Sequence, residues 1–486
     1  MRGLNEVLLL ALIASALIGC VDQRAEVNRY REVLDHDAPF VEALKEGEPL
    51  LLSRALLLAN QDNENLAIRG EDYVQAIAEK DRAFSTFLPT ISLAPSYTIV
   101  DNADAPTTNA DGTARAVGTS GGFKAVSNTL RRFEAPVNAS MNLFRGFRDA
   151  ASFEAAIAGV EQRRLILLDV RASLLLQVAD TYYQVLRFER AVQVLKQSLQ
   201  AQSERVRDAT TRLNAGTGSA LEVAQSEAQA ASTRVRLTQA QGSVNTARVL
   251  LAFLIGAKGE ITGPLRDDYR IPADVGSMQA LLERGWAGRE DLRAARANVE
   301  AQQANVQAAI GQYYPSVALN LNGFLFRENF ETASKWNALL SINLPIFTGG
   351  QIEADVRFAW SRLRQAAMAE SLLRRQIEQE IRTRRQDLQT SRASLTEIQA
   401  QIRAAAEALR QSRAGFDAGT AITLDVLNAQ DVLLQAQLEW TNEEFNEKFQ
   451  YLQLLRAMGS LTFAEVRGAT SQPTTAPTTQ PVRATP

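Results

Sequence analysis

Two acidic residues, Asp425 and Glu222, have the most informative positions for chemistry in this chain. Asp425 follows Gly419 by six residues, and Glu222 follows Gly216 by the same distance. Each glycine ends a long helix-forming segment, so each carboxylate falls in the first turns of the returning segment. A carboxylate there stabilises the positive end of the helix dipole. If it faces a passage for solutes, it also attracts cations and disfavours anions. Asn428 adds an amide three residues after Asp425.

Other kinds of chemistry are disfavoured by the composition. The chain has one Cys and one His, which leaves no Cys/His metal site and no His-based catalysis. A net charge of −3 argues against a nucleic-acid partner. No G-x-x-x-x-G-K-[ST] segment is present for nucleotide binding. We therefore expect no catalytic residues, no metal and no cofactor.

The single cysteine, Cys20, ends an apparent export signal. An apolar run from Val7 to Ile18 has the length of a signal-peptide core and is too short to span a bilayer. The sequence Leu17-Ile18-Gly19-Cys20 resembles a bacterial lipobox, although an incidental cysteine in a signal peptide would look the same. We expect residues 1–19 to be a signal peptide and 20–49 a lipid-anchored segment. Cys20 is followed by Val21 and not by Asp, which by resemblance to lipoprotein sorting implies the outer membrane.

The chain also contains an internal repeat, which decides the architecture. Three landmark pairs are each 203 residues apart: Phe144 and Phe347, Gly216 and Gly419, and Gly256 and Gly459. We expect a first repeat over 50–262 and a second over 263–461. A Thr- and Pro-rich tail over 462–486 is expected to be disordered.

Long helices fill most of each repeat. Two stretches of 127 residues, after Pro136 and after Pro345, contain no proline and are rich in Ala, Gln, Arg, Glu and Leu. We expect helices over about 147–212 and 220–256, then over about 350–416 and 422–459. Helices of roughly 60 residues would be about 90 Å long, which favours a coiled-coil or tubular setting.

Four segments alternate apolar and polar residues with a period of two. They cover about 88–100, 132–144, 315–326 and 335–347. This pattern fits a half-buried soluble sheet and also a lipid-facing barrel strand. Four strands cannot close a barrel, since the smallest membrane-spanning barrels have eight. If the strands lie in a membrane, several copies of the chain must pool them.

These motifs, in this order and twice over, resemble the TolC-like outer-membrane efflux protein family, in its lipoprotein branch. The resemblance covers roughly residues 50–461. It rests on Phe87-Leu88-Pro89, Tyr314-Pro315-Ser316, Phe347-Thr348-Gly349-Gly350, Arg289-Glu290-Asp291-Leu292, and Ala418-Gly419-Thr420 leading to Leu424-Asp425-Val426-Leu427.

The resemblance implies a mainly α fold with a small membrane β-barrel and two repeats of strand, strand, long helix and helix. Three copies would form a twelve-stranded outer-membrane barrel continued by a long periplasmic helical tube. The implied function is the exit duct of a tripartite efflux or secretion system. The implied partners are two further copies, a periplasmic adaptor, an inner-membrane pump and outer-membrane lipid.

The resemblance also assigns roles at the hairpin tips. In the family an acidic pair three residues apart narrows the pore; here the positions are Asp425 and Asn428, with Glu222 as the first-repeat equivalent. The residues implied in adaptor contact are Gly216, Thr217, Gly419 and Thr420. Two glycines of this set could equally be plain helix C-caps.

Some family members tie the closed tip with a tyrosine and an arginine that flank the tip glycine. The matching positions here are Phe416 and Ala421, and neither side chain can form that hydrogen bond. Closure of the tip must therefore rest on other contacts.

Two other functional classes fit the sequence less well. A coiled-coil structural lipoprotein of the envelope, without a channel, would explain the helices but not the alternating strands. An enzyme would need organised carboxylates, whereas these lie mostly on long helical faces. Five Met and one His favour organic solutes over soft metals as cargo. Trp336, Phe324 and Phe326 fit either an aromatic girdle or ordinary packing.

Overall fold

The computed structural model describes residues 22–45, 47–102, 128–267, 269–327, 335–463 and 465. Cys20 and the expected signal peptide lie outside these residues. The chain divides into two compact units, which are described separately. The first comprises Met1–Ala76, Glu161–Ala297 and Met368–Pro486, and the second comprises Ile77–Val160 and Asn298–Ala367.

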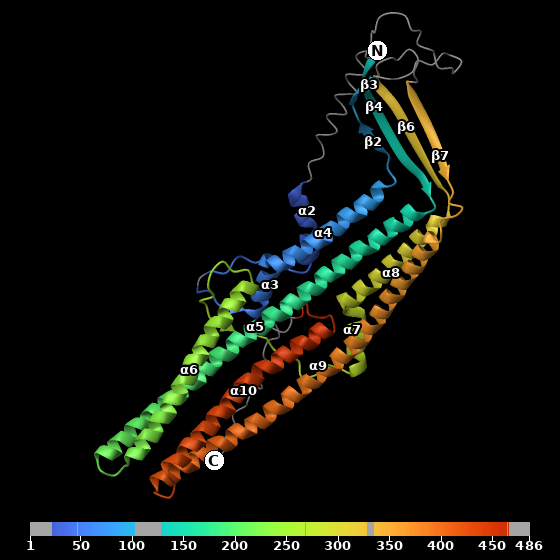
Figure 1. The fold of residues 1–486 in the computed structure, drawn as a ribbon. Coiled ribbons are helices and arrows are strands. Elements are labelled where there is room, and N and C mark those ends of the chain that lie inside the picture. Colours follow the sequence, from blue (N-terminus) through green and yellow to red (C-terminus); the bar gives the residue numbers. More distant parts are fainter. Residues whose placement is uncertain are drawn as a thin grey trace, which may run out of the picture. The chain divides into compact units, whose positions relative to one another are not determined.

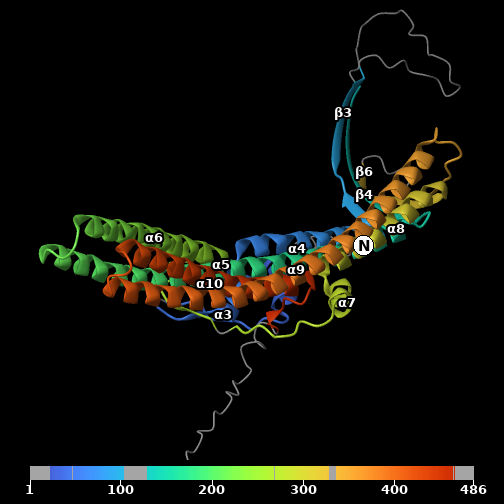
Figure 2. The ribbon, with the colours of Figure 1, turned by 90° about the horizontal axis from the view of Figure 1, so that it is seen from below.

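Two long helical hairpins dominate the structure, as Figures 1 and 2 show. The first joins α5 (Arg148–Asn214) to α6 (Ala220–Leu254), and the second joins α9 (Gln351–Asp417) to α10 (Thr423–Ala457). α5 and α9 each have 67 residues and α6 and α10 each have 35, so the repeat is preserved to the residue. A 67-residue helix is about 100 Å long. The predicted mainly α fold with two internal repeats is confirmed.

A pair of shorter helices precedes each half's strands. These are α3 (Leu52–Asp62) and α4 (Glu64–Ser85) in the first repeat, and α7 (Met278–Gly288) and α8 (Glu290–Ile310) in the second. A 3-10 turn, η1 (Gly311–Tyr313), follows α8. No described helix is apolar enough over sufficient length to cross a bilayer.

The first unit has its core where the short helices meet the long hairpins. Tyr182 of α5 is fully buried there, and its hydroxyl lies 2.8 Å from the carbonyl oxygens of Leu50 and Arg266. Those residues belong to the short parallel strands β1 (Leu50–Leu51) and β5 (Leu265–Arg266). One buried tyrosine therefore fastens α5 to the segments that start the two repeats.

The second unit contains an antiparallel sheet. Its strands are β2 (Thr90–Leu93), β3 (Ser96–Asn102), β4 (Asn128–Arg145), β6 (Ser316–Arg327) and β7 (Trp336–Asn343). The order is β2-β4-β6-β7, and β3 also pairs with β4. The two repeats thus share one sheet through the β4–β6 pair.

Two strand predictions need correction. The expected single strand over 88–100 is split into β2 and β3 at Ala94 and Pro95, because proline has no N–H for the ladder. β7 ends at Asn343, short of the expected 347, since Pro345 follows closely.

The register gives this sheet one apolar and one polar face, because paired residues point to the same side. The apolar face includes the rows Leu93, Val137, Gly323 and Trp336; Ile91, Ala139, Leu321 and Ala338; Met141, Leu319 and Leu340; and Phe144, Val317 and Ile342. The polar face includes three rows of mostly Ser, Thr and Asn: Thr90, Ser140, Asn320 and Leu339; Ser92, Asn138, Asn322 and Asn337; and Asn142, Ala318 and Ser341. The period-two alternation in the sequence therefore corresponds to two chemically distinct surfaces.

The segments at both ends of the described chain are packed against the first unit. Tyr30 and Leu34 of α2 (Gln23–Asp35) are buried, and a Cβ on Gly70 would lie 2.5 Å from the Tyr30 ring. Arg171 of α5 pairs with Asp37 at 2.7 Å. Phe463 is only 3% exposed and belongs to the core. Thus α2 and the residues after it belong to the packed part of the chain, which extends to Phe463, past the expected limit at 461.

Candidate functional site

The two hairpin tips have the same backbone. Gly216 and Gly419 have φ angles of 74° and 76°, in the left-handed region that favours glycine. A Cβ on either would meet no atom within 4 Å, so the glycine is required by conformation and not by space. The two glycines therefore have the conformation of helix C-caps, as one of the two expectations from the sequence stated.

The threonine after each glycine completes the cap. The Thr217 N–H donates to the Arg212 carbonyl oxygen at 2.9 Å, and the Thr420 N–H donates to that of Gly415 at 2.8 Å. Both hydroxyls donate to the same carbonyls, at 3.2 and 3.1 Å. Each threonine helps to satisfy a helix-end acceptor, to which the N–H of the next residue also donates, from Gly218 at 3.0 Å and from Ala421 at 3.1 Å.

The two acidic residues of the tips have different surroundings. Asp425 is exposed, and its Oδ2 accepts the Ile422 N–H at 3.1 Å, which satisfies one free donor at the start of α10. Asn428 is also exposed and lies three residues later on the same helix face. Asp425 is thus both a helix-capping carboxylate and an outward-facing charge beside an amide.

Glu222 is half-buried within the protomer. It lines a cavity of about 60 Å³ between the two hairpins, together with Arg205, Arg212, Phe416 and Asp417. The start of α6 is capped by a serine in its place: the Glu222 N–H donates to Ser219 Oγ at 3.2 Å. Glu222 and Asp425 are therefore equivalent in sequence but not in exposure.

Phe416 holds the two tips together by a contact that the sequence did not reveal. The guanidinium carbons of Arg212 and Arg205 lie 4.7 and 5.6 Å from its ring centroid. Both distances are within the range of cation–π attraction. Arg212 also lies 3.9 Å from Asp417. Two arginines of α5 therefore contact the last turn of α9. The contact of Arg205 and Arg212 with Phe416 is called the clasp below.

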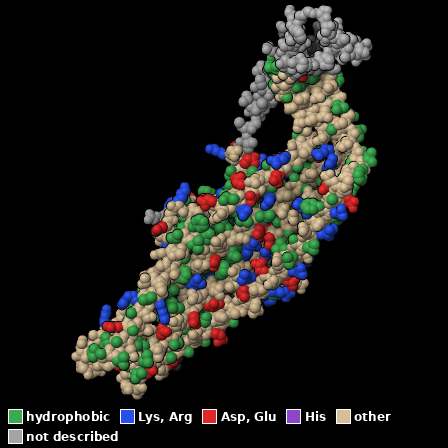
Figure 3. Space-filling model, in the orientation of Figure 1, with side chains coloured by type: hydrophobic (Ala, Val, Ile, Leu, Met, Phe, Trp, Pro, Cys, Tyr) green, Lys and Arg blue, Asp and Glu red, His purple; other side chains and the backbone are tan. Residues whose placement is uncertain are grey.

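Charge at this clasp is not fully balanced. Burial lowers the pKa of the Arg205 guanidinium, and the nearby Arg413 lowers it further. Like charges and partial burial both weaken the clasp, because each disfavours the charged form of Arg205. On the face shown in Figure 3, charged side chains of both signs are interspersed along the helices.

α6 and α10 bury several polar side chains above the tips. Ser226, Thr233, Thr423 and Gln430 are buried there, and in the described part of the chain their side-chain oxygens have no hydrogen-bond partner. A buried polar group without a partner costs about 1–3 kcal/mol. Separation of the hairpins would hydrate these groups, so this contact favours the joined state less than an apolar one would.

The bases of the hairpins share a second conserved geometry. Gly256 and Gly459 have φ angles of 67° and 66°, and a Cβ would lie 2.4 Å from the Asp62 oxygen or 2.5 Å from that of Gly288. In the first repeat Asn63 Nδ2 donates to the Leu254 carbonyl oxygen at 2.9 Å.

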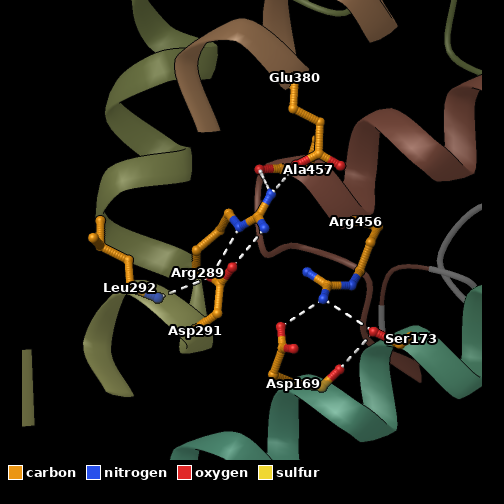
Figure 4. Close-up of polar contacts among 8 residues, drawn as sticks. All are labelled: Asp169, Ser173, Arg289, Asp291, Leu292, Glu380, Arg456 and Ala457. Carbon is orange, nitrogen blue, oxygen red and sulfur yellow. Dashed lines mark hydrogen bonds and ion pairs between the residues drawn. The ribbon is translucent and has the colours of Figure 1, made fainter. Parts of the chain in front are cut away.

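The second repeat has an arginine in the same role. Arg289 Nη1 lies 3.5 Å from the Ala457 carbonyl oxygen, 203 residues after Leu254. Arg289 also makes two bonds to Asp291, at 2.9 and 2.6 Å, and one to Glu380 (Figure 4). Burial opposes the charge of Arg289, but Asp291 and Glu380 raise its pKa overall. From the sequence, Arg289-Glu290-Asp291-Leu292 was recognised only as a motif, and the contacts of Arg289 with Glu380 and Ala457 were not predicted.

A second ion pair lies beside this cluster, as Figure 4 shows. Arg456 Nη2 is 2.5 Å from Asp169 Oδ1 and 3.1 Å from Ser173 Oγ. Burial raises the pKa of Asp169 in spite of Arg456. The end of α10 is therefore tied to α8 and α9 through Arg289 and to α5 through Arg456.

Comparison with known proteins agrees with this architecture. The family model "Outer membrane efflux protein" matches residues 75–257 and 281–460. The chain is 26% identical to outer membrane efflux protein BepC of Brucella suis over 324 residues, covering 66% of this chain and 70% of that protein. It is 22% identical to outer membrane protein TolC of Vibrio cholerae, covering 94% of this chain and 97% of that protein.

Solved structures share the fold. The outer-membrane channel OprN has a TM-score of 0.71 at 22% identity, covering 84% of this chain and 90% of that one. With the family model matching both repeats and the fold shared with a solved structure, the chain belongs to the outer membrane efflux protein family.

Proposed function

We propose that three copies of the chain form a passive exit duct that a periplasmic adaptor connects to an inner-membrane pump. The main argument for three copies comes from the sheet. Among the described strands β7 pairs only with β6, and β2 and β3 pair only with β4. Unpaired strand edges need partners in a membrane. Since β2 and β3 lie along the same neighbour and count as one interrupted strand, each copy has four strands and three copies would supply twelve. The two 67-residue helices of each copy would continue the duct.

Planar-bilayer recording of the purified protein tests the channel, and cross-linking tests the number of chains. We expect low-conductance channels, because the tips are held together by the Phe416 clasp. Cross-linking in detergent should give a species of three chains. A monomer with no conductance at any voltage would contradict the proposal.

In this duct Asp425 and Asn428 form the narrow gate. Their exposure on one face of α10 supports this, since three copies would place three carboxylates and three amides around one axis. A carboxylate ring favours cations. Glu222, half-buried between the hairpins of one protomer, has a smaller part in it.

Matched substitutions separate the two acids. Asp425→Asn retains an oxygen for the Ile422 N–H but removes the charge, so cation selectivity should fall while the fold is retained. Glu222→Gln removes the same charge from the half-buried position and should change selectivity less. Reversal potentials in asymmetric KCl measure both. Equal shifts would remove the distinction between the two residues.

The tips also form the adaptor contact in this proposal. Gly216, Thr217, Gly419 and Thr420 lie at exposed turns, where a partner could reach backbone groups. A photo-cross-linking amino acid at Thr420 should capture an adaptor in native cells, whereas one at Arg357, which is 73% exposed along α9, should not. Capture from both positions, or from neither, would contradict the assignment.

We further propose that Cys20 carries a lipid. The described chain starts at Asp22, and α2 begins at Gln23 and packs on the first unit. Two intervening residues span at most about 10 Å, so the anchor would hold α2 near the membrane surface. Palmitate labelling should disappear in Cys20→Ser. Labelling that persists in this variant would reject the anchor.

A further inference from the structure

The two strand-to-helix corners have the same backbone but different residues. Gly146 and Phe147 join β4 to α5, and Gly349 and Gly350 precede α9 at positions 203 residues later. Their φ angles are 65°, 62°, 63° and 85°, so both corners use two successive left-handed residues. Phe147 is the only residue other than glycine with positive φ among the described residues.

This conformation is unfavourable for phenylalanine. Left-handed backbone costs a bulky residue about 1–3 kcal/mol, whereas glycine adopts it freely. The space around the corner explains Gly146, because a Cβ there would lie 2.2 Å from the Gly311 oxygen. Space does not explain Phe147, since the equivalent position of the second corner, with the same left-handed backbone, is occupied by Gly350. The Phe147 side chain must offset its own strain.

Phe147 does not do so by entering the protein core, because it is 68% exposed. Its ring packs edge-on against Phe144, at 5.1 Å between centroids, and against Tyr314, at 6.5 Å. Phe144 belongs to the last row of the apolar sheet face, beside Val317 and Ile342. Phe147 therefore extends that face beyond the end of the strands.

We propose that Phe147, with Phe144 and Tyr314, is an aromatic anchor that seats this corner in the interfacial zone of the lipid bilayer. Aromatic residues form girdles at both interfaces of membrane barrels, and Tyr314 joins an apolar ring to a hydroxyl that can remain hydrated. Arg145 and Arg148 flank the ring, and arginine can extend its charged group from there to the headgroups. Arg145 is paired with Asp149 at 3.1 Å, so the site attracts by its aromatic surface more than by net charge.

The anchor rests on the proposed seating of the sheet in the membrane, with the apolar face toward lipid. The second corner would be seated differently. Ile346 and Phe347 are 93% and 89% exposed there, while Gly350 contributes no side chain. Phe147 is thus an addition specific to the first repeat.

The test uses trifluoromethylphenylalanine at single positions of the full chain in vesicles of phosphatidylethanolamine and phosphatidylglycerol. Fluorine line broadening is measured with headgroup-nitroxide lipid and, separately, with an aqueous gadolinium chelate. The positions are 147, Leu340 on the apolar face, and Phe253 of α6, which is 64% exposed and serves as the matched control. We expect the lipid nitroxide to broaden the signals from 147 and 340 severalfold more than that from 253.

The outcomes separate the two proposals. Broadening at 340 but not at 147 would overturn the anchor and leave the membrane seating of the sheet intact. Absence of lipid broadening at 340 would overturn both. Equal lipid broadening at 253 and 147 would also overturn the anchor, since the corner would then be no different from a helix surface.

A substitution tests the strain independently. Phe147→Gly copies Gly350 and removes the unfavourable backbone, so unfolding in detergent should need at least as much urea as in the unmodified chain. Recovery of the folded chain with floated vesicles should nevertheless fall severalfold, while Phe147→Trp should preserve it. Unchanged recovery with glycine would contradict the anchor.

Discussion

The bases of the two hairpins perform one task with different chemistry. In the first repeat a neutral amide, Asn63, reaches the carbonyl at the end of α6; in the second a buried cation, Arg289, reaches the matching carbonyl of α10. The glycines beside them, Gly256 and Gly459, have φ angles within one degree of each other. Duplication has therefore kept the backbone, and the side chains have diverged on it.

The difference makes the second base an ionic junction. Arg289 joins α8 to α9 through Glu380 and stands beside the pair of Arg456 and Asp169. The first base has a single amide in this place. At the equivalent position of the tips the second repeat exposes its carboxylate, Asp425, whereas Glu222 of the first is half-buried. The second hairpin is therefore held by charge at its base and presents charge at its tip.

Removal of Arg289 should have the largest effect. Arg289→Ala leaves Asp291 and Glu380 without their cation, and loss of one partner from a buried pair costs about 3–5 kcal/mol. Asn63→Ala should cost less, about 1–3 kcal/mol, since no charge is left behind. Urea unfolding of both variants in detergent measures the difference, and equal losses would remove the contrast between the bases.

The glycine substitutions should come next and should be equal. Gly256→Ala and Gly459→Ala each force a Cβ against backbone and each require an unfavourable φ, with an expected cost of about 2–3 kcal/mol. Gly242→Ala in α6, where a Cβ meets nothing within 4 Å, is the control and should stabilise by up to about 1 kcal/mol. Unequal losses of unfolding free energy at 256 and 459 would mean that the shared backbone conformation does not contribute equally to stability in the two repeats.

Loosening the tip clasp should have a smaller effect on stability and a visible one on the channel. Phe416→Leu keeps apolar volume but loses the attraction to Arg205 and Arg212, which is worth about 1–2 kcal/mol. Single-channel recording should show more frequent opening. The matched variant Phe358→Leu, at an exposed ring of α9 outside the tips, should not change opening. If it does, the effect is not specific to the clasp.

Acidification should have the smallest effect, and Asp169 at the second base should contribute to it. Burial raises the pKa of Asp169, so the folded chain holds that proton more tightly than the unfolded chain. As pH falls from neutral through this raised pKa, Asp169 should add stability, and Asp169→Asn should abolish the gain. Asp291 acts in the opposite sense: its pKa is lowered, so its contribution is lost only below the ordinary aspartate range. Unfolding midpoints between pH 7 and pH 4 test this, and an unchanged pH profile in Asp169→Asn would exclude it.

The sequence was sufficient for the long helices, for the strand-forming segments and for their order. Proline-free stretches rich in helix formers placed the long helices within a few residues, since proline alone stops a helix regardless of its surroundings. Alternation placed the strands, and the tip glycines were found because only glycine takes the left-handed turn freely. The break at Pro95 was missed because the strand on both sides keeps its pairing with the same neighbour, β4.

What the sequence by itself determined is the duplicated framework, because backbone constraints act between neighbouring residues. The tertiary structure decided which copies of equivalent residues differ. Arg212 and Phe416 are 204 positions apart, and Arg289 and Glu380 are 91 apart, so no local pattern joins them. The exposure of Asp425 and the half-burial of Glu222 likewise depend on how the hairpins pack. Packing is set by contacts between distant segments, and it is there that the two repeats took on different roles.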